Sequence, residues 1–341
     1  MRLRKKGAAD SGFSAARSGR NAACGAEKQV AGASWNRGQS NNLKTVKKKN
    51  SIKMHLYALS TILLWSTAFP VTRIVGGAIP PIELGAIRCV SAAVFLCIAG
   101  AVDRIRLPRS IGHCCLLALA GALGFGFYMI LFNTGMKTLT SVTSSLVIAT
   151  TPIMTALAAS YLYHERLSRT GYLTIATAFI GVMILLLWKG VLSINVGVIW
   201  MFGAAVLFCG YNLLNRKLQA LGYSSMEIMT YAMISAAVIL MIAAPHAFGQ
   251  IKTAGAKNAL LAVYLGIVVS AIAYFLWAKA FENAEHTSDV TNYMFLTPLV
   301  TTVLGFIMLK EVPDLGTVIG GAIIIASVII FNKYGKRPAP Q

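Results

Sequence analysis

The sequence predicts an all-α membrane protein with ten transmembrane helices, arranged as two inverted five-helix repeats. The chain of 341 residues is 56% hydrophobic and only 12% charged, with a mean hydropathy of +0.67, whereas a soluble domain carries about 25% charged residues. Apolar runs of about 20 residues, the length that crosses a bilayer, recur from residue 55 onward. The two halves of the chain also align with each other at a nearly constant offset.

The N-terminal segment, residues 1–53, differs in composition from the rest. It holds thirteen of the 31 Lys and Arg residues and only two acids, and it contains almost no large apolar side chains. Such a segment cannot bury a core, so we expect a disordered basic tail. It could be a tail drawn to anionic lipid, a transit peptide, or a start-site extension ahead of Met54. Because much of the net charge of +20 lies there, we expect the lipid bilayer, and no nucleic acid, as a partner.

Ten apolar runs follow the tail, and short polar breaks separate them. Backbone polar groups in a lipid core must be satisfied within the segment, so we expect these runs to be helices. The expected spans are 56–74, 82–101, 113–135, 142–162, 170–188, 196–214, 226–244, 259–281, 288–309 and 314–332.

The distribution of Lys and Arg between the short loops predicts the orientation. If the N-terminus is cytoplasmic, the inner loops and the C-terminal tail hold ten of these residues and the outer loops hold five. Cytoplasmic loops are enriched in Lys and Arg. We therefore predict a multi-pass protein of the bacterial inner (plasma) membrane with both termini cytoplasmic.

An internal repeat divides the membrane part into residues 54–189 and 190–334, followed by a short tail at 335–341. The offsets between the halves lie between 143 and 146 residues: Trp65–Arg73 aligns with Phe208–Arg216, Tyr128 with Tyr274, Thr151–Pro152 with Thr297–Pro298, and Glu165 with Glu311. Each half has five spans, an odd number, so the second half must enter the membrane from the opposite side. Inverted repeats of this kind are typical of secondary transporters, whose solute site lies between the repeats.

Several of these residues resemble a known family. Leu63 to Pro70 is similar to an opening apolar-Trp-small motif, and Arg88 stands early in the second span. The run Pro152…Glu165-Arg166-Leu167…Gly171 closes the first repeat, and its second copy lacks the Arg-Leu pair and has Thr317 in place of the glycine. The chain thereby resembles the EamA-type members of the drug/metabolite transporter superfamily. The resemblance covers about 54–332 and implies ten helices and export or exchange of small metabolites such as amino acids.

Other function classes stay open at this point. An organellar sugar-nucleotide or phosphate carrier of the same superfamily is the nearest alternative, and a non-transporting scaffold or an intramembrane enzyme is a more distant one. The sequence has no zinc-protease, Walker or nucleophile-elbow motif. We therefore expect no catalytic residue, no cofactor and no metal site, and we expect a gradient or exchange to drive transport.

The candidate solute-binding residues are polar or aromatic side chains within the spans, because such side chains usually face the protein interior. An arginine at position 88 could hold a solute carboxylate, although a structural ion pair or a side chain that reaches the membrane interface is an alternative. Aromatic faces with a few amides suit small amphiphilic solutes. The candidates are Trp65, Arg88, Tyr128, Asn133, Thr151, Tyr211, Asn212, Tyr274, Trp277, Asn292 and Thr297.

Two prolines and one glycine pair predict local geometry. Pro152 and Pro298 stand at matching places within their spans, where each would kink its helix and leave one carbonyl without its helical partner. Gly316 and Gly320 form a G-x-x-x-G spacing in the last span. That spacing predicts a close-packing face, which could also be a homodimer contact.

Overall fold

A computed structural model describes residues 52–162, 167–188, 195–283, 290 and 292–335. The chain divides into two units, Met1–Lys53 and Met54–Gln341. The predicted tail lies almost wholly outside the described residues, as does residue 336 onward. Within the described residues every regular element is a helix and no β-strand occurs, which confirms the all-α prediction.

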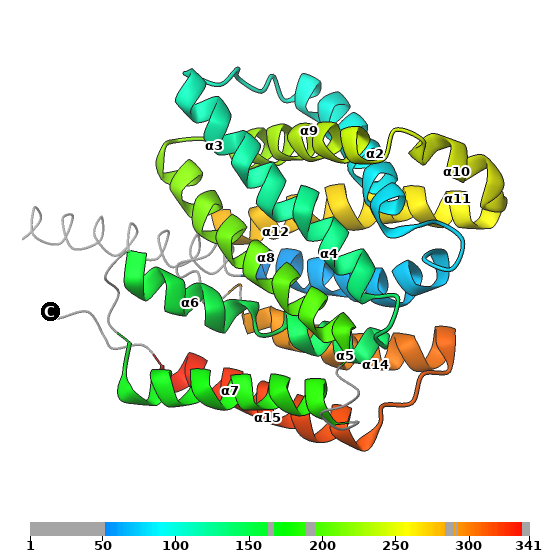
Figure 1. Ribbon diagram of the computed structural model, residues 1–341. Helices are drawn as coiled ribbons and strands as arrows, with labels where there is room; N and C mark the ends of the chain where they lie inside the picture. The colour runs from blue at the N-terminus through cyan, green and yellow to red at the C-terminus, as the bar shows by residue number, and fades with distance from the viewer. Residues whose placement is uncertain (1–51, 163–166, 189–194, 284–289, 291, 336–341) are drawn as a thin grey trace, which may run out of the picture. The chain divides into compact units, whose positions relative to one another are not determined.

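The helices alternate with short connections along the whole membrane part (Figure 1). In the first half they are the first helix Ile52–Val75, α2 Pro81–Val102, α3 Ile111–Gly121, η1 Ala122–Gly126, α4 Phe127–Gly135, α5 Ser141–Ile148, α6 Thr151–Leu162 and α7 Arg169–Leu187. In the second half they are α8 Val196–Ala220, α9 Ser225–Ala243, α10 Ala247–Thr253, α11 Gly255–Tyr264, η3 Leu265–Ile272, α12 Ala273–Glu282, η4 Asn292–Phe295, α14 Leu296–Leu309 and α15 Leu315–Tyr334.

Side-chain caps fix where many of these helices begin. A helix leaves its first N–H groups without partners, and Ser, Thr, Asn or Asp can accept from them. Ser224 accepts a hydrogen bond from the Glu227 N–H, and the Glu227 carboxylate accepts from the Ser224 N–H, which is a capping box at the start of α9. Single caps of the same kind begin other helices, and they are Ser110, Thr140, Ser168, Asn195 and Asp314.

In the part of the chain that the structure describes, seven helical segments are long and apolar enough to cross a membrane. They are Ile52–Val75, Pro81–Val102, Ile111–Gly135, Ser141–Leu162, Val196–Ala220, Ser225–Ala243 and Gly255–Glu282. The three other expected spans correspond to shorter apolar stretches, Arg169–Leu185, Leu296–Leu309 and Leu315–Phe331.

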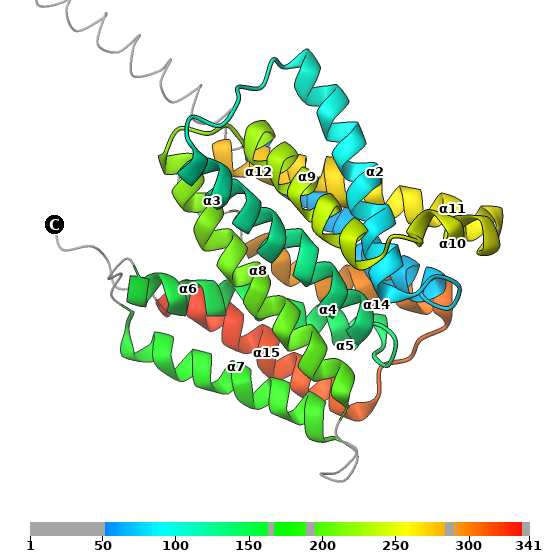
Figure 2. The same ribbon diagram turned by 45° about the horizontal axis from the view of Figure 1, so that its top comes forward.

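Helices of the first half pack on helices of the second half. Helix α2 packs on α9, α4 on α8, and α5 on α14. Figures 1 and 2 both show α7 and α15 side by side, and these two helices share the largest helix–helix contact. The two halves are therefore interleaved, and a single hydrophobic core contains residues from both.

Glycines allow the close approach of α7 and α15. A Cβ atom at Gly181 would lie 2.9 Å from the Gly320 carbonyl oxygen, and one at Gly316 would lie 2.1 Å from a ring carbon of Trp188. The G-x-x-x-G face of α15 thus packs against the C-terminal half of α7 and the residue after it in the same chain. A homodimer contact stays a prediction.

The structure adds detail at two places that the apolar runs did not show. The residues between the expected spans 226–244 and 259–281 contain the helix α10 and the start of α11. The expected span 142–162 corresponds to the candidate span Ser141–Leu162, and a turn at Ala149 and Thr150 separates α5 from α6 within it. The reason is the proline at 152, which has no N–H to continue the helical hydrogen bonds and whose ring disfavours helical backbone just before it.

Candidate solute-binding site

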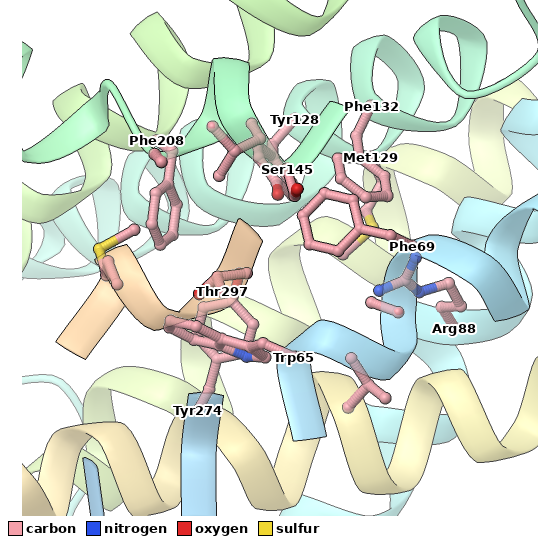
Figure 3. Close-up of a pocket in the computed structure, with 15 residues that line it drawn as sticks. Trp65, Phe69, Arg88, Tyr128, Met129, Phe132, Ser145, Phe208, Tyr274 and Thr297 are labelled. Atoms are coloured by element: carbon pink, nitrogen blue, oxygen red, sulfur yellow. The ribbon is translucent and has the colours of Figure 1, made fainter. Parts of the chain in front are cut away.

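A cavity of about 40 Å³ lies between the two halves of the chain. It has room for a few water molecules. Figure 3 shows its lining as sticks. The first half contributes Trp65, Ala68, Phe69, Arg88, Tyr128, Met129, Phe132, Ser145, Ile148 and Ala149, and the second half contributes Phe208, Val269, Tyr274, Met294 and Thr297. We call this space the central cavity.

Four aromatic rings from both halves meet in the central cavity. The Trp65 ring lies edge-on to Tyr274 and to Phe208, with centroid distances of 4.7 and 6.3 Å. The Tyr128 ring lies 5.5 Å from that of Phe208. These separations fall in the range where aromatic pairs attract each other. The repeat aligns Trp65 with Phe208 and Tyr128 with Tyr274, so the cluster consists of two pairs of equivalent positions.

Arg88 is the charged side chain in this lining, and it is 3% exposed. Its Nη1 donates to Thr72 Oγ1 at 3.4 Å and its Nη2 donates to Ser270 Oγ at 3.3 Å. Both hydrogen bonds are long, and Nε has no partner. None of the acidic side chains that the structure describes forms an ion pair with it. A buried cation with so little compensation carries a large desolvation cost, which an anionic group in the cavity would offset.

A π-helical segment precedes each cavity tyrosine. The segment η1 ends at Gly126, two residues before Tyr128, and η3 ends at Ile272, two residues before Tyr274. The ends of both segments are 146 residues apart, the same offset as the tyrosines. π-helical turns are rare and are frequent at functional sites. Both π-helical segments therefore stand directly before a residue that lines the cavity.

The two prolines lie near helix starts. Pro152 is the second residue of α6, and the Ile148 carbonyl just before the break accepts a hydrogen bond from Thr151 Oγ1 at 2.7 Å. Pro298 is the third residue of α14 and follows the 3-10 turn η4. Neither proline lies in the middle of an unbroken helix. Both interrupted regions border the central cavity through Ile148, Ala149, Met294 and Thr297.

Five of the candidate residues line the central cavity: Trp65, Arg88, Tyr128, Tyr274 and Thr297. Two others support its wall. Trp277 packs on Trp65 at a centroid distance of 5.0 Å, and Tyr211 stacks behind Phe208 at 5.6 Å.

The remaining candidates lie elsewhere. Thr151 is buried and its hydroxyl is bonded to the backbone, while Asn212 is half-buried on α8. Asn133 lies at a different cavity. The side chain of Asn292 is outside the described residues.

Several lining residues were not predicted, and the principal one is Phe208. The alignment of Trp65 with Phe208 contained the signal, because equivalent positions of two repeats share an environment. Phe69, Met129, Ser145 and Met294 also line the cavity. These residues are of types that are common in any helix interface, so nothing in the sequence distinguishes them from packing residues.

A second, more polar cavity of about 330 Å³ lies at one end of the bundle. Thr72, Arg73, Gly76, Gly77, Pro81, Leu84, Asn133, Met136 and Lys137 line it. We call it the vestibule. Its loops, 76–80 and 136–140, belong to the end predicted to face outward.

An ion pair connects the two halves beside the vestibule. Arg73 Nη1 lies 3.0 Å from Glu311 Oε1 and also donates to the Leu139 carbonyl at 2.8 Å. The other carboxylate oxygen of Glu311 accepts from the Ser141 N–H at 2.8 Å, at the start of α5. The first helix, α5 and the end of α14 are therefore joined here.

The chain is similar to known transporters over most of its length. The model of the EamA-like transporter family matches residues 52–187 and again 195–333. A probable terminal-alkyne amino-acid exporter of Streptantibioticus cattleyicolor is 30% identical, over 81% of this chain and 93% of the relative. A probable amino-acid metabolite efflux pump of Salmonella typhimurium is 24% identical, over 82% of this chain and 94% of the relative. One crystal structure matches with a TM-score of 0.57 and 20% identity, over 81% of this chain and 94% of that chain, which supports the fold.

Proposed function

Since the chain belongs to the EamA-like transporter family, we propose that it exports or exchanges amino acids or related small metabolites by alternating access. The family and its named members make the chain a multi-pass membrane transporter of small molecules and not an enzyme. The finer proposal comprises ten spans in two inverted repeats, residues 54–189 and 190–334, in a bacterial inner membrane with both termini cytoplasmic.

The buried guanidinium of Arg88, which has two long hydrogen bonds and no ion pair among the described residues, carries the proposal. A solute carboxylate is the counter-charge that this cavity lacks, and a guanidinium binds carboxylates through two parallel hydrogen bonds. The surrounding Trp65, Tyr128, Phe208 and Tyr274 rings suit an apolar side chain on the same solute. The names of two relatives, an amino-acid exporter and an amino-acid metabolite efflux pump, agree with a solute of this chemistry.

The packing between the halves supports alternating access. The central cavity is lined by both halves, and polar contacts between the halves occur at both ends of the first helix. Arg73 pairs with Glu311 near its C-terminal end, and the His55 ring lies 2.6 Å from the Tyr293 hydroxyl near its N-terminal end. Movement of one half against the other would break one set of contacts and keep the other. Such rocking around a fixed central site is how inverted-repeat transporters work.

Substitution of Arg88 tests the proposal with purified protein. L-Phenylalanine serves as the probe, and phenethylamine, which has no carboxylate, serves as its comparison. We expect Arg88→Lys to weaken binding of L-phenylalanine at the central cavity about 10- to 150-fold, because a charged hydrogen bond contributes about 1.5–3 kcal/mol. Arg88→Met should weaken it further, and neither change should weaken phenethylamine binding. Arg169→Lys on the exposed start of α7 is the matched control.

The melting temperature in detergent separates binding from structure. The two hydrogen bonds of Arg88 are long, and the buried charge is costly, so Arg88→Met should melt within a few degrees of the original chain. If Arg88→Met lowers the melting temperature strongly and weakens both probes alike, Arg88 is a structural residue and the proposed carboxylate contact is refuted.

A further inference from the structure

The vestibule carries chemistry that the central cavity does not use. Two cationic side chains, Arg73 and Lys137, line it, and none of the acidic residues that the structure describes is part of the lining. Arg73 is compensated by Glu311 at 3.0 Å. Lys137 is exposed, and its side chain forms no hydrogen bond or ion pair with the residues that the structure describes. The vestibule wall therefore presents one uncompensated positive charge, which attracts the anionic end of a solute.

Asn133 supplies the complementary group. Its residue is 3% exposed, and its Nδ2 donates to the Pro81 carbonyl at 2.9 Å, which fixes the orientation of the amide. Its Oδ1 has no hydrogen-bond partner. A buried carbonyl oxygen without a donor costs about 1–3 kcal/mol, so this oxygen favours a ligand that brings an N–H group.

The spacing of these two groups suits a zwitterion. Asn133 belongs to α4, and Lys137 follows four residues later, just after the helix ends at Gly135. Lys137 stands in the turn that ends α4, where its backbone N–H donates to the Thr134 carbonyl at 3.2 Å, and both residues line the same cavity. One ligand can therefore place its carboxylate at Lys137 and its ammonium at Asn133, as an α-amino acid does.

The vestibule also adjoins the central cavity. Thr72 lines the vestibule, and its hydroxyl accepts the hydrogen bond from Arg88 Nη1. Arg88 itself lines the central cavity. The partition between the two spaces thus includes the long Arg88–Thr72 hydrogen bond, which a carboxylate that approaches Arg88 would replace.

We propose that the vestibule is a second solute station, which binds the charged head of an α-amino acid between Lys137 and Asn133. The solute occupies it immediately before or after the central cavity. This inference rests on the proposed function, and it adds a binding site and a substrate class, zwitterionic α-amino acids, for that site.

Equilibrium binding to the full chain in nanodiscs tests the station, with radiolabelled L-phenylalanine as the probe. We expect two bound molecules per chain. Lys137→Gln should remove one of them, and Lys252→Gln, an exposed cation on α10, should remove none. Asn133→Leu should also remove one, but it leaves the Pro81 carbonyl without its donor, so the comparison relies first on Lys137→Gln. Both variants must melt at the temperature of the original chain.

Two analogues test the zwitterion requirement. 3-Phenylpropionate lacks the ammonium and phenethylamine lacks the carboxylate. Each should compete for the vestibule at least about tenfold more weakly than L-phenylalanine, because each loses one charged hydrogen bond.

The outcomes separate this inference from the proposed function. Loss of one site in Lys137→Gln and of the other in Arg88→Met supports both. Two outcomes overturn the second station and leave the proposed function in place. In the first, the chain binds one molecule, and Arg88→Met abolishes this binding while Lys137→Gln does not. In the second, the chain binds one molecule, and each of the two variants abolishes the binding. A site that only Lys137→Gln removes supports the station and refutes the role of Arg88. No binding of L-phenylalanine to the original chain overturns both.

Discussion

The ion pair between Arg73 and Glu311 should hold the vestibule end of the transporter closed. Each of the elements that it joins also lines the central cavity: the first helix through Trp65, α5 through Ser145, and α14 through Thr297. Separation of these three elements is needed to open that end. Glu311→Gln is the smallest change that removes the charge, because the amide keeps one oxygen to accept from the α5 backbone.

The structure sets the size of the effect. The Arg73 side chain is 37% exposed and that of Glu311 is 8% exposed. Exposed ion pairs contribute about 0–1 kcal/mol, and breaking a fully buried one costs about 3–5 kcal/mol. For this half-buried pair, screened by solvent on the arginine side, we expect about 1–2 kcal/mol. That energy shifts the equilibrium between closed and open ends by about 5- to 30-fold.

Cysteine labelling measures this shift. A Ser145→Cys side chain in the central cavity is introduced into a chain whose six native cysteines are replaced. A membrane-impermeant thiol reagent is then added on the side where the vestibule opens. We expect Glu311→Gln to accelerate labelling by up to about 5- to 30-fold.

A double-mutant cycle provides the control. Arg73→Gln should have a similar effect, and the double variant should label no faster than either single one, because both changes break the same interaction. If Glu311→Gln lowers the melting temperature but leaves the labelling rate unchanged, the ion pair stabilises the fold without controlling access to the central cavity, and the prediction is refuted. Fully additive effects of the two changes would also refute the reasoning.

Two further predictions concern packing and the tail. A Cβ atom at Gly181 would lie 2.7 Å from Ile324 and 2.9 Å from the Gly320 carbonyl, so Gly181→Ala should destabilise the chain by about 1–3 kcal/mol in a detergent melt. A Cβ atom at Gly249 has no heavy atom within 4 Å, so Gly249→Ala should leave the melting temperature unchanged. Equal effects of Gly181→Ala and Gly249→Ala on the melting temperature would contradict this account. Removal of residues 1–53 should preserve folding and transport, because the segment has almost no large apolar side chains to pack on the bundle. Loss of membrane insertion would instead indicate a targeting role, and a cell-fractionation assay decides between them.

The repeat in the sequence anticipated much of the central cavity. Trp65, Tyr128 and Tyr274 were predicted as candidates and line it, and the aligned partner of Trp65, Phe208, completes the cluster. The alignment succeeds because equivalent positions in two interleaved halves meet at one interface. It fails for Thr151, whose partner Thr297 lines the cavity while its own hydroxyl is used by the backbone at 148.

Composition and the length of apolar runs by themselves determined that the chain is helical and lies in a membrane, because a lipid core permits few other ways to satisfy the backbone. The motifs and the repeat determined the family. Only the tertiary structure decided that Arg88 is buried with no ion pair to any acidic residue described, that Asn133 belongs to the vestibule, and that Glu311 pairs with Arg73 rather than with its neighbour Lys310. These are contacts between helices far apart in sequence, and they depend on how the helices rotate about their axes, which a single apolar sequence does not encode locally.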